Sequence, residues 1–226
     1  MNTKISIAAL GYALCAANSA FAVSLTEPVP PYGDFVINGT TVALRPELAG
    51  LVLEDDISNF SISGAGESFS GTIQNRVVRS VDGTLDFYWR IMPTAGTGDI
   101  SAFRVTGFSG YALDADWRID GLGTAAPDIA RYFGSASGDV NFLFDSHQVG
   151  IGESSMFFFL DTQATNYART GQFDLLCADN GCISSLYSTF APSAVPVPAA
   201  AWLFGSGLMG LIGIARRNKQ DTSFKA

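Results

Sequence analysis

Between residues 23 and 194 the chain alternates short apolar stretches with turn-forming residues. The stretch from 84 to 91 alternates strictly, with apolar side chains at Leu85, Phe87, Trp89 and Ile91 and polar or amphipathic ones between them. A period of two is typical of a strand with one buried face. Residues 156–160 are apolar at every position. This run predicts a central strand that is buried on both faces.

Eight stretches rich in Val, Ile, Phe, Tyr or Thr predict strands, because each is bounded by glycine, proline or Asp-Gly. They are Asp34–Leu44, Ser70–Arg79, Thr84–Met92, Ile100–Phe108, Ala112–Ile119, Asp139–Phe144, Ser155–Asp161 and Gln172–Cys177. One short helical turn is predicted at Pro127–Tyr132. We therefore predict an all-β domain at 23–190, an antiparallel β-sandwich of jelly-roll-like type.

The first 22 residues have the pattern of a secretory signal peptide. Lys4 supplies the positive charge, Ile5–Ala17 is apolar, and Ala20 and Ala22 form an A-x-A cleavage site. Signal peptides combine these three regions in this order. The mature chain is expected to begin near Val23.

The other end of the chain has the pattern of a membrane segment. The motif Val195, Pro196, Val197, Pro198 precedes an uncharged run at 199–215, and Arg216 and Arg217 follow it. As a helix, residues 195–215 would span about 31 Å, close to a hydrocarbon core of roughly 30 Å. The basic residues are expected on the cytoplasmic side. We therefore predict a linker at 191–198, one transmembrane helix at 199–215 and a basic cytoplasmic tail at 216–226.

Together, the Val-Pro-x-Pro motif, the Gly-rich apolar segment Trp202–Gly210 and the arginine pair resemble the C-terminal sorting domain of PEP-CTERM proteins. The resemblance covers residues 195–217, with Val197 where that family usually has Glu and nine residues after Arg217. It implies a Gram-negative bacterial protein that is exported, anchored by this helix, processed by an exosortase-type enzyme and placed at the cell surface or outside. It also implies an association with exopolysaccharide and biofilm. The alternative is an ordinary C-terminal transmembrane anchor.

Cys177 and Cys182 are the only cysteines left after signal cleavage. Exported proteins meet an oxidising compartment, and the four residues between the cysteines favour a tight hairpin that would bring the sulfurs together. A disulfide is therefore predicted. A metal pair is the alternative, but no further Cys or His completes a ligand set.

The charge of the domain limits its partners. Residues 23–194 carry eight arginines, no lysine and twenty acidic residues, a net charge of 8 − 20 = −12 with His147 neutral. Nucleic acid is not an expected partner, because phosphate binding needs clustered cations.

Candidate chemistry is sparse, and we expect neither enzymatic activity nor a cofactor. His147, the only histidine, follows a predicted strand in a polar loop. Asp114, Asp116 and Asp120 form a D-x-D-x-x-x-D pattern whose alternatives are a calcium site or a strand with an Asp-Gly turn. Further acidic residues, including Glu54-Asp55-Asp56, Asp139, Asp145 and Asp161, leave an acidic-residue hydrolase as an alternative.

The aromatic residues leave a carbohydrate-binding module as another alternative. Tyr88, Tyr111, Trp117 and Tyr132 are its first candidates. Core packing is the expected role of most aromatic residues in such a domain, because large rings dominate core energetics. The favoured function is a non-enzymatic envelope or extracellular-matrix protein, with a carbohydrate- or calcium-binding adhesive module as the alternative.

Overall fold

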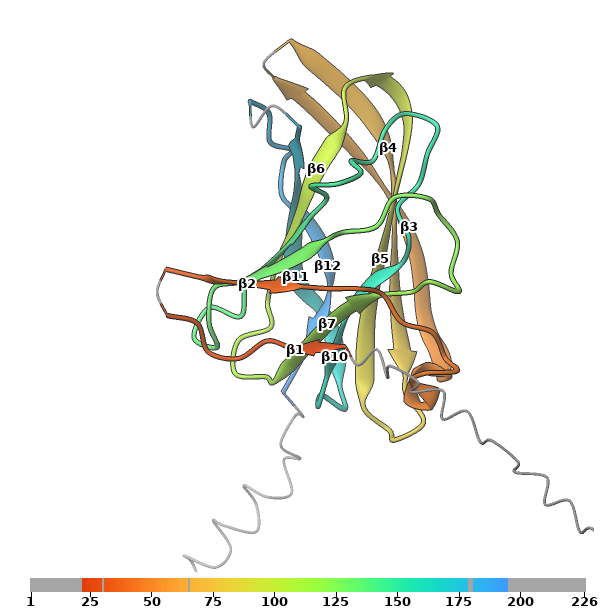
Figure 1. Ribbon diagram of the computed structural model, residues 1–226, viewed down its shortest axis with the longest axis vertical. Coiled ribbons are helices and arrows are strands. Elements are labelled where there is room, and N and C mark those ends of the chain that lie inside the picture. Colours follow the sequence, from red (N-terminus) through yellow and green to blue (C-terminus); the bar gives the residue numbers. More distant parts are fainter. Residues whose placement is uncertain (1–21, 30, 65, 179–180, 195–226) are drawn as a thin grey trace, which may run out of the picture. The chain divides into compact units, whose positions relative to one another are not determined.

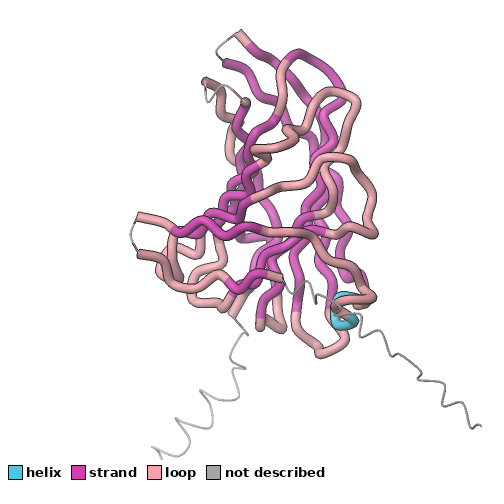
Figure 2. The backbone as a smooth tube through the Cα atoms, in the orientation of Figure 1, coloured by secondary structure: helices cyan, strands magenta, loops and turns pink. Residues whose placement is uncertain are grey.

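Two antiparallel sheets make up the part of the chain that the structure describes. The computed structural model describes residues 22–194, except 30, 65, 179 and 180. Sheet A has the strand order β1-β7-β10-β5-β4-β3, and sheet B has the order β12-β11-β6-β9-β8-β2. The sheets lie face to face (Figure 1). The predicted all-β class with antiparallel sheets is confirmed; the helical content of the described residues is the single turn η1, Pro46–Leu48 (Figure 2).

Each sheet contains six strands. The strands of sheet A are β1 Val23–Ser24, β3 Leu51–Gly64, β4 Glu67–Arg79, β5 Leu85–Thr97, β7 Leu113–Trp117 and β10 Phe158–Thr162. The strands of sheet B are β2 Gly33–Val36, β6 Ile100–Thr106, β8 Ile129–Tyr132, β9 Val140–Leu143, β11 Tyr167–Cys177 and β12 Tyr187–Pro192. The packed unit that holds both sheets ends at Pro192, two residues beyond the predicted domain end.

The predicted features at the two ends fall outside the described residues, except Ala22, which lies next to β1. They are Ala20 of the cleavage site, the motif Val195–Pro198, the helix predicted at 199–215 and the pair Arg216 and Arg217. Among the described residues, no helix has the length and apolar composition needed to cross a membrane.

The core lies between the sheets and is rich in phenylalanine. Phe158, on a central strand of sheet A, has no exposed surface. Its ring centroid lies 4.8 Å from that of Phe142 and 5.1 Å from that of Phe103, both on sheet B. Trp89 packs in the same cluster and donates its indole N–H to Thr189 Oγ1 across the sheets, at 2.8 Å. Most of these aromatic rings therefore pack in the core.

The core-facing side chains predicted for β5 and the two-faced burial predicted for β10 are both confirmed. The other face of β5 was expected to be exposed, but Asp86 and Tyr88 on it are buried as well. Leu85, Phe87, Trp89 and Ile91 all point into the main core. In β10 and the residue before it, Phe158 faces this core, whereas Phe157 and Phe159 join a second apolar cluster on the outer face of sheet A. That second cluster is completed by Leu48, Val78 and Tyr88.

The long strand predicted at Asp34–Leu44 is wrong beyond Val36. Gly39 takes a positive φ of 81°, and a Cβ there would meet the Trp117 ring. The chain therefore leaves sheet B, and η1 places Leu48 over the second cluster on sheet A. Burying that apolar face is worth more to this segment than continuing the strand.

The helical turn predicted at Pro127–Tyr132 is also wrong, because Ile129–Tyr132 forms β8 between β9 and β2. Ala130 and Tyr132 face the core, so the segment has strand periodicity over only four residues. No strand was expected at β1, β3 or β12. The 14-residue β3 is an edge strand with few buried side chains, and pairing with β4 holds it.

Candidate functional site

A row of polar side chains crosses the outer face of sheet B. The register places Asp34 opposite Arg131, Arg131 opposite Asn141, Asn141 opposite Arg104 and Arg104 opposite Asp174. Their chain neighbours in β6, β8, β9 and β11 face the core, so these five side chains point outward. Five adjacent strands spaced by about 4.8 Å give the row a length of roughly 19 Å. We call these five residues the polar row.

Both arginines of the polar row are held by paired hydrogen bonds. Arg131 Nε and Nη2 donate to the two carboxylate oxygens of Asp34, at 2.6 and 2.9 Å. Arg104 Nε donates to Asp174 Oδ1 at 2.6 Å, and its Nη2 donates to the other oxygen. The hydrogen bond from Arg131 lowers the pKa of Asp34. At neutral pH, two positive and two negative charges cancel, and the planar groups are fixed in place.

Asn141 lies at the centre of the polar row, between two hollows in the surface. One, of about 250 Å³, is lined by Arg104, Asn141 and Gln172 among others. The second, of about 340 Å³, is lined by Arg131 and Asn141 together with several apolar residues and the polar residues Ser101, Asp145 and Gln148. The row is therefore open to a ligand on both of its sides.

An apolar strip runs beside the polar row. Its members also lie opposite one another on five strands: Val36, Ile129, Leu143, Ala102 and Leu176. Three of them, Ala102, Leu143 and Leu176, line the second hollow. The face therefore offers fixed donors and acceptors next to apolar surface.

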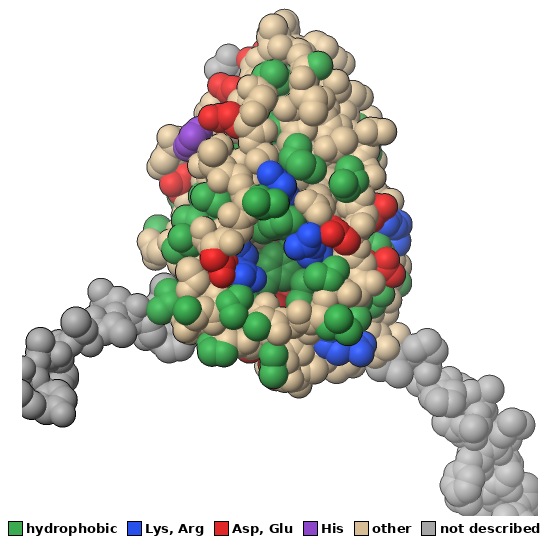
Figure 3. Space-filling view, turned by 90° about the vertical axis from the view of Figure 1, so that its right-hand side faces the viewer, with side chains coloured by type: hydrophobic (Ala, Val, Ile, Leu, Met, Phe, Trp, Pro, Cys, Tyr) green, Lys and Arg blue, Asp and Glu red, His purple; other side chains and the backbone are tan. Residues whose placement is uncertain are grey.

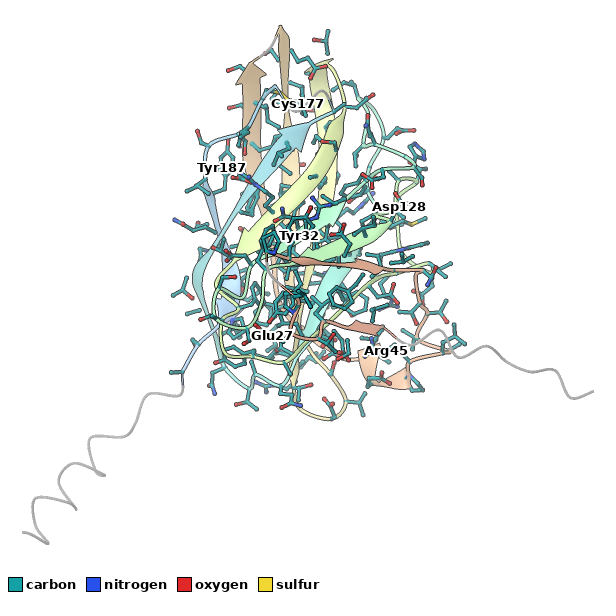
Figure 4. All side chains as sticks on the ribbon, turned by 60° about the vertical axis from the view of Figure 1, so that its left-hand side comes forward. Glu27, Tyr32, Arg45, Asp128, Cys177 and Tyr187 are labelled. Atoms are coloured by element: carbon teal, nitrogen blue, oxygen red, sulfur yellow. A yellow bond between two sulfur atoms is a disulfide. The ribbon has the colours of Figure 1, made fainter. Side chains whose placement is uncertain are left out.

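Two exposed aromatic rings adjoin the polar row at the β2 side. Tyr32 is 40% exposed and Phe133 is 37% exposed, with ring centroids 5.7 Å apart. The guanidinium of Arg131 lies 4.3 Å from the centre of the Tyr32 ring. Figure 4 labels Tyr32 just before β2 and Tyr187 on β12, the two edge strands of sheet B.

The structure places Cys177 and Cys182 as a disulfide pair, with their Cα atoms 5.4 Å apart. Both residues are buried in the main core. The N–H of Cys177 donates to the carbonyl of Cys182, and Leu176 pairs antiparallel with Ile183. The local hairpin geometry is therefore as predicted. Glu67 approaches the two sulfurs, but a bridged pair offers no thiolate to a metal.

The four aromatic residues considered for sugar stacking are not exposed platforms. Tyr88 and Tyr132 are buried, and Tyr111 and Trp117 pack partly buried against the main core. Burial raises the pKa of the Tyr88 hydroxyl. The exposed rings beside a polar surface are instead Tyr32 and Phe133, which the sequence analysis did not single out.

The D-x-D pattern is used inside the fold. Asp116 accepts hydrogen bonds from the N–H of Gly39 at 2.8 Å and of Trp117 at 2.9 Å, and burial raises its pKa to about 6. Asp120 pairs with Arg118 and accepts from the N–H of Val42. In the described part of the chain, these aspartates do not converge into a group of three metal ligands.

A row of three carboxyl groups crosses the outer face of sheet A, where Asp114 lies opposite Asp161 and Asp161 opposite Asp86. Asp86 has no exposed surface. Burial raises its pKa to about 8, and the charge of Asp161 adds to the rise. Arg45 donates to Asp161 Oδ2 at 2.6 Å, and Ser80 donates to Asp86 Oδ2 at 2.7 Å. Figure 4 shows Arg45 at the end of the domain opposite Cys177.

His147 lies in an exposed loop, as predicted, where its Nε2 is 3.1 Å from Glu153 Oε2. Its side chain is 52% exposed. Beyond Glu153, the surrounding hollow is lined mainly by loop residues such as Asp99 and Asp145. The ring therefore has an acidic partner, Glu153, in an exposed loop.

Sequence reasoning missed the polar row because its members are spread from residue 34 to residue 174. One local signal was present. Arg104, Arg131 and Asn141 each stand alone between two apolar residues of a strand: Phe103 and Val105, Ala130 and Tyr132, Val140 and Phe142. Only the register of the sheet brings these outward positions into one line.

The fold and this face define an all-β protein of two antiparallel sheets with an open row of paired charges on one outer face. No protein-family model, curated protein or solved structure matches this chain.

Proposed function

We propose that the chain is a non-enzymatic exported envelope or extracellular-matrix protein that contacts polysaccharide through the polar row on sheet B. The row of fixed, mutually neutralised Asp, Arg and Asn side chains carries this proposal. A sugar hydroxyl both donates and accepts hydrogen bonds, as the groups of the row do together. The apolar strip and the rings of Tyr32 and Phe133 suit the C–H faces of sugar rings.

A neutral glycan suits this face better than an ion does. The two arginines are neutralised by Asp34 and Asp174, so an anion gains little net attraction. A small apolar ligand would leave the planar polar groups desolvated. A chain of several sugar units lying across the strands would use the full length of the row and both hollows.

The proposal includes the route by which the protein reaches polysaccharide. Residues 1–22 act as the signal peptide, and an exosortase-type enzyme processes the sorting segment that begins at Val195–Pro198. Until then, the helix at 199–215 anchors the chain in the inner membrane of a Gram-negative cell. The jelly-roll-like form of the sandwich belongs to the same proposal. A Cys177–Cys182 disulfide supports export, because such bonds persist in oxidising compartments.

Removing the polar row is expected to abolish polysaccharide binding without unfolding the domain. The full-length chain in detergent is passed over immobilised exopolysaccharide from the native host. Arg131→Gln and Asn141→Ala are each expected to weaken retention at least tenfold, because each removes central, outward hydrogen-bonding groups.

The matched control is Arg169→Gln, which removes an arginine that pairs with Asp56 of β3, away from the polar row. Its retention is expected to equal that of the wild type. Equal retention of Arg131→Gln and the control, or no retention of the wild type, would contradict the proposed contact.

A secreted hydrolase is the second candidate, because Asp86 and Asp161 both have raised pKa values. A catalytic carboxyl must reach its substrate, and Asp86 has no exposed surface. Ser80 donates to Asp86, and Arg45 donates to Asp161. These hydrogen bonds favour a structural role for the two carboxyl groups. Glycan turnover that Asp161→Asn abolishes would favour the hydrolase instead.

A further inference from the structure

A further open hollow lies on the outer face of sheet A. It has a volume of about 400 Å³. Leu48, Val78, Tyr88 and Phe157 form its apolar floor, and Arg76 and Arg118 stand at its sides. Figure 3 shows this face, with basic and acidic side chains around a hollowed, hydrophobic centre. Its size is within the usual range for sites that bind small molecules.

Arg76 and Arg118 line this hollow, and both have carboxylate partners. Arg90 lies beside it, with its guanidinium over the Phe157 ring. Arg76 pairs with Asp55 at 2.8 Å, and Arg118 pairs with Asp120 at 2.7 Å. Among the described residues, Arg90 has no acidic partner within ion-pair distance, and its Nη2 donates to Ser154 Oγ at 2.8 Å. Burial lowers the pKa of Arg90, and the charge of Arg76 lowers it further. The positive charge beside the hollow therefore comes from Arg90, because the Arg76–Asp55 and Arg118–Asp120 pairs are each neutral.

Two of these guanidinium groups also have unused donors. In the described part of the chain, Nε of Arg76 and Nε of Arg90 are buried and have no hydrogen-bond acceptor. Both groups lie over the Phe157 ring, 4.6 and 5.9 Å from its centre. An anionic oxygen in the hollow would offset the charge of these guanidinium groups.

The rim of the hollow exposes apolar side chains. Val52 is 46% exposed and Leu122 is 63% exposed, and both line it. Ile57, 61% exposed, lies opposite Gln74 on the neighbouring strand. A ligand with an apolar body would cover this surface and remove it from water.

We propose that this hollow binds a small organic carboxylate with a flat apolar body. The carboxylate lies at the arginine side, beside Arg76 and within the field of Arg90. The apolar body lies on the floor formed by Val78, Tyr88 and Phe157. A neutral sugar would not balance the unpaired guanidinium, and an inorganic anion would leave the apolar floor and rim uncovered. This site is separate from the polar row on sheet B and does not depend on polysaccharide binding.

The test compares 2-naphthoate with its neutral counterpart, 2-naphthamide. Each is titrated by calorimetry into the full-length chain in detergent, with detergent alone as the blank. We expect saturable one-to-one binding of the naphthoate that weakens as salt rises, and at least tenfold weaker binding of the amide.

The variants locate the binding. Arg76→Gln and Arg90→Gln are each expected to weaken naphthoate binding at least fivefold. Arg79→Gln, which removes the same charge from β4 outside the hollow, is expected to change it less than twofold. Thermal melting checks that the variants fold. If Arg76→Gln does not fold, the result with Arg90→Gln decides whether the proposal stands. No saturable binding, equal binding of the amide, or equal effects of Arg79→Gln and Arg90→Gln would overturn the proposal.

Discussion

Phe158→Ala is expected to lower the free energy of unfolding by about 4 kcal/mol, in the upper part of the range for core truncations. Phe158 has no exposed surface and lies on β10 in the middle of sheet A. Its ring contacts four others, from Trp89, Phe103, Phe142 and Phe144. These rings come from both sheets, so no single element can collapse into the space that the ring leaves.

Urea unfolding followed by circular dichroism measures this loss. The control is Phe133→Ala, which truncates the same residue type at a 37% exposed position. We expect it to cost less than about 1 kcal/mol. If Phe158→Ala were no more destabilising than Phe133→Ala, the two sheets would not share the core that we describe.

The wild-type protein is expected to lose stability between about pH 5 and pH 9. Asp86→Asn is expected to prevent this loss. Burial and the neighbouring Asp161 raise the pKa of Asp86 to about 8 in the folded state, whereas an unfolded aspartate titrates near 3.9. The folded state thus holds an extra proton between these values. The protonated Asp86 carboxyl therefore contributes stability at low pH, and this contribution is lost as the pH rises through about 8.

The expected size follows from the same pKa difference. At pH 9 the variant is expected to be more stable than the wild type by roughly 3 to 5 kcal/mol. At pH 5 the two are expected to be nearly equal, because Asn can accept from Ser80 as the neutral carboxyl does. Melting temperatures at pH 5, 7 and 9 provide the measurement.

Asp145→Asn is the matched control for this pH series, because Asp145 lies in an exposed loop. The control is expected to retain the stability loss of the wild type toward pH 9. A wild-type protein that is as stable at pH 9 as at pH 5 would show that Asp86 ionises freely in the folded state.

The fold class was predictable because the strands with one clear buried face carry strong alternation. β5 is such a case, and its core-facing side chains were predicted one by one. β10 was predictable for another reason, because it is apolar at every position and buried on both faces. β3 was not predictable in the same way, because its residues gain little burial and depend on pairing with β4. The path after Val36 was missed because the apolar residues there cover the outer face of sheet A instead of extending β2.

The polar row and the carboxyl row were beyond prediction for a different reason. Asp34 and Arg131 lie 97 residues apart, and Asp86 and Asp161 lie on strands that are neighbours only through the strand order of sheet A. A sequence shows that such residues point outward, but it does not show which strands are paired or in what register. The disulfide was predictable because its two cysteines are close in the chain.

The measurement that most directly tests the central claim is intact-mass and C-terminal peptide analysis of the protein from separated fractions of its native host. The account predicts a species that begins near Val23, ends near Val195–Pro198 and occurs in the outer fraction or the medium. A species that retains Trp202 to Arg217 in the inner membrane would contradict sorting and release, and the chain would then be a plainly anchored membrane protein.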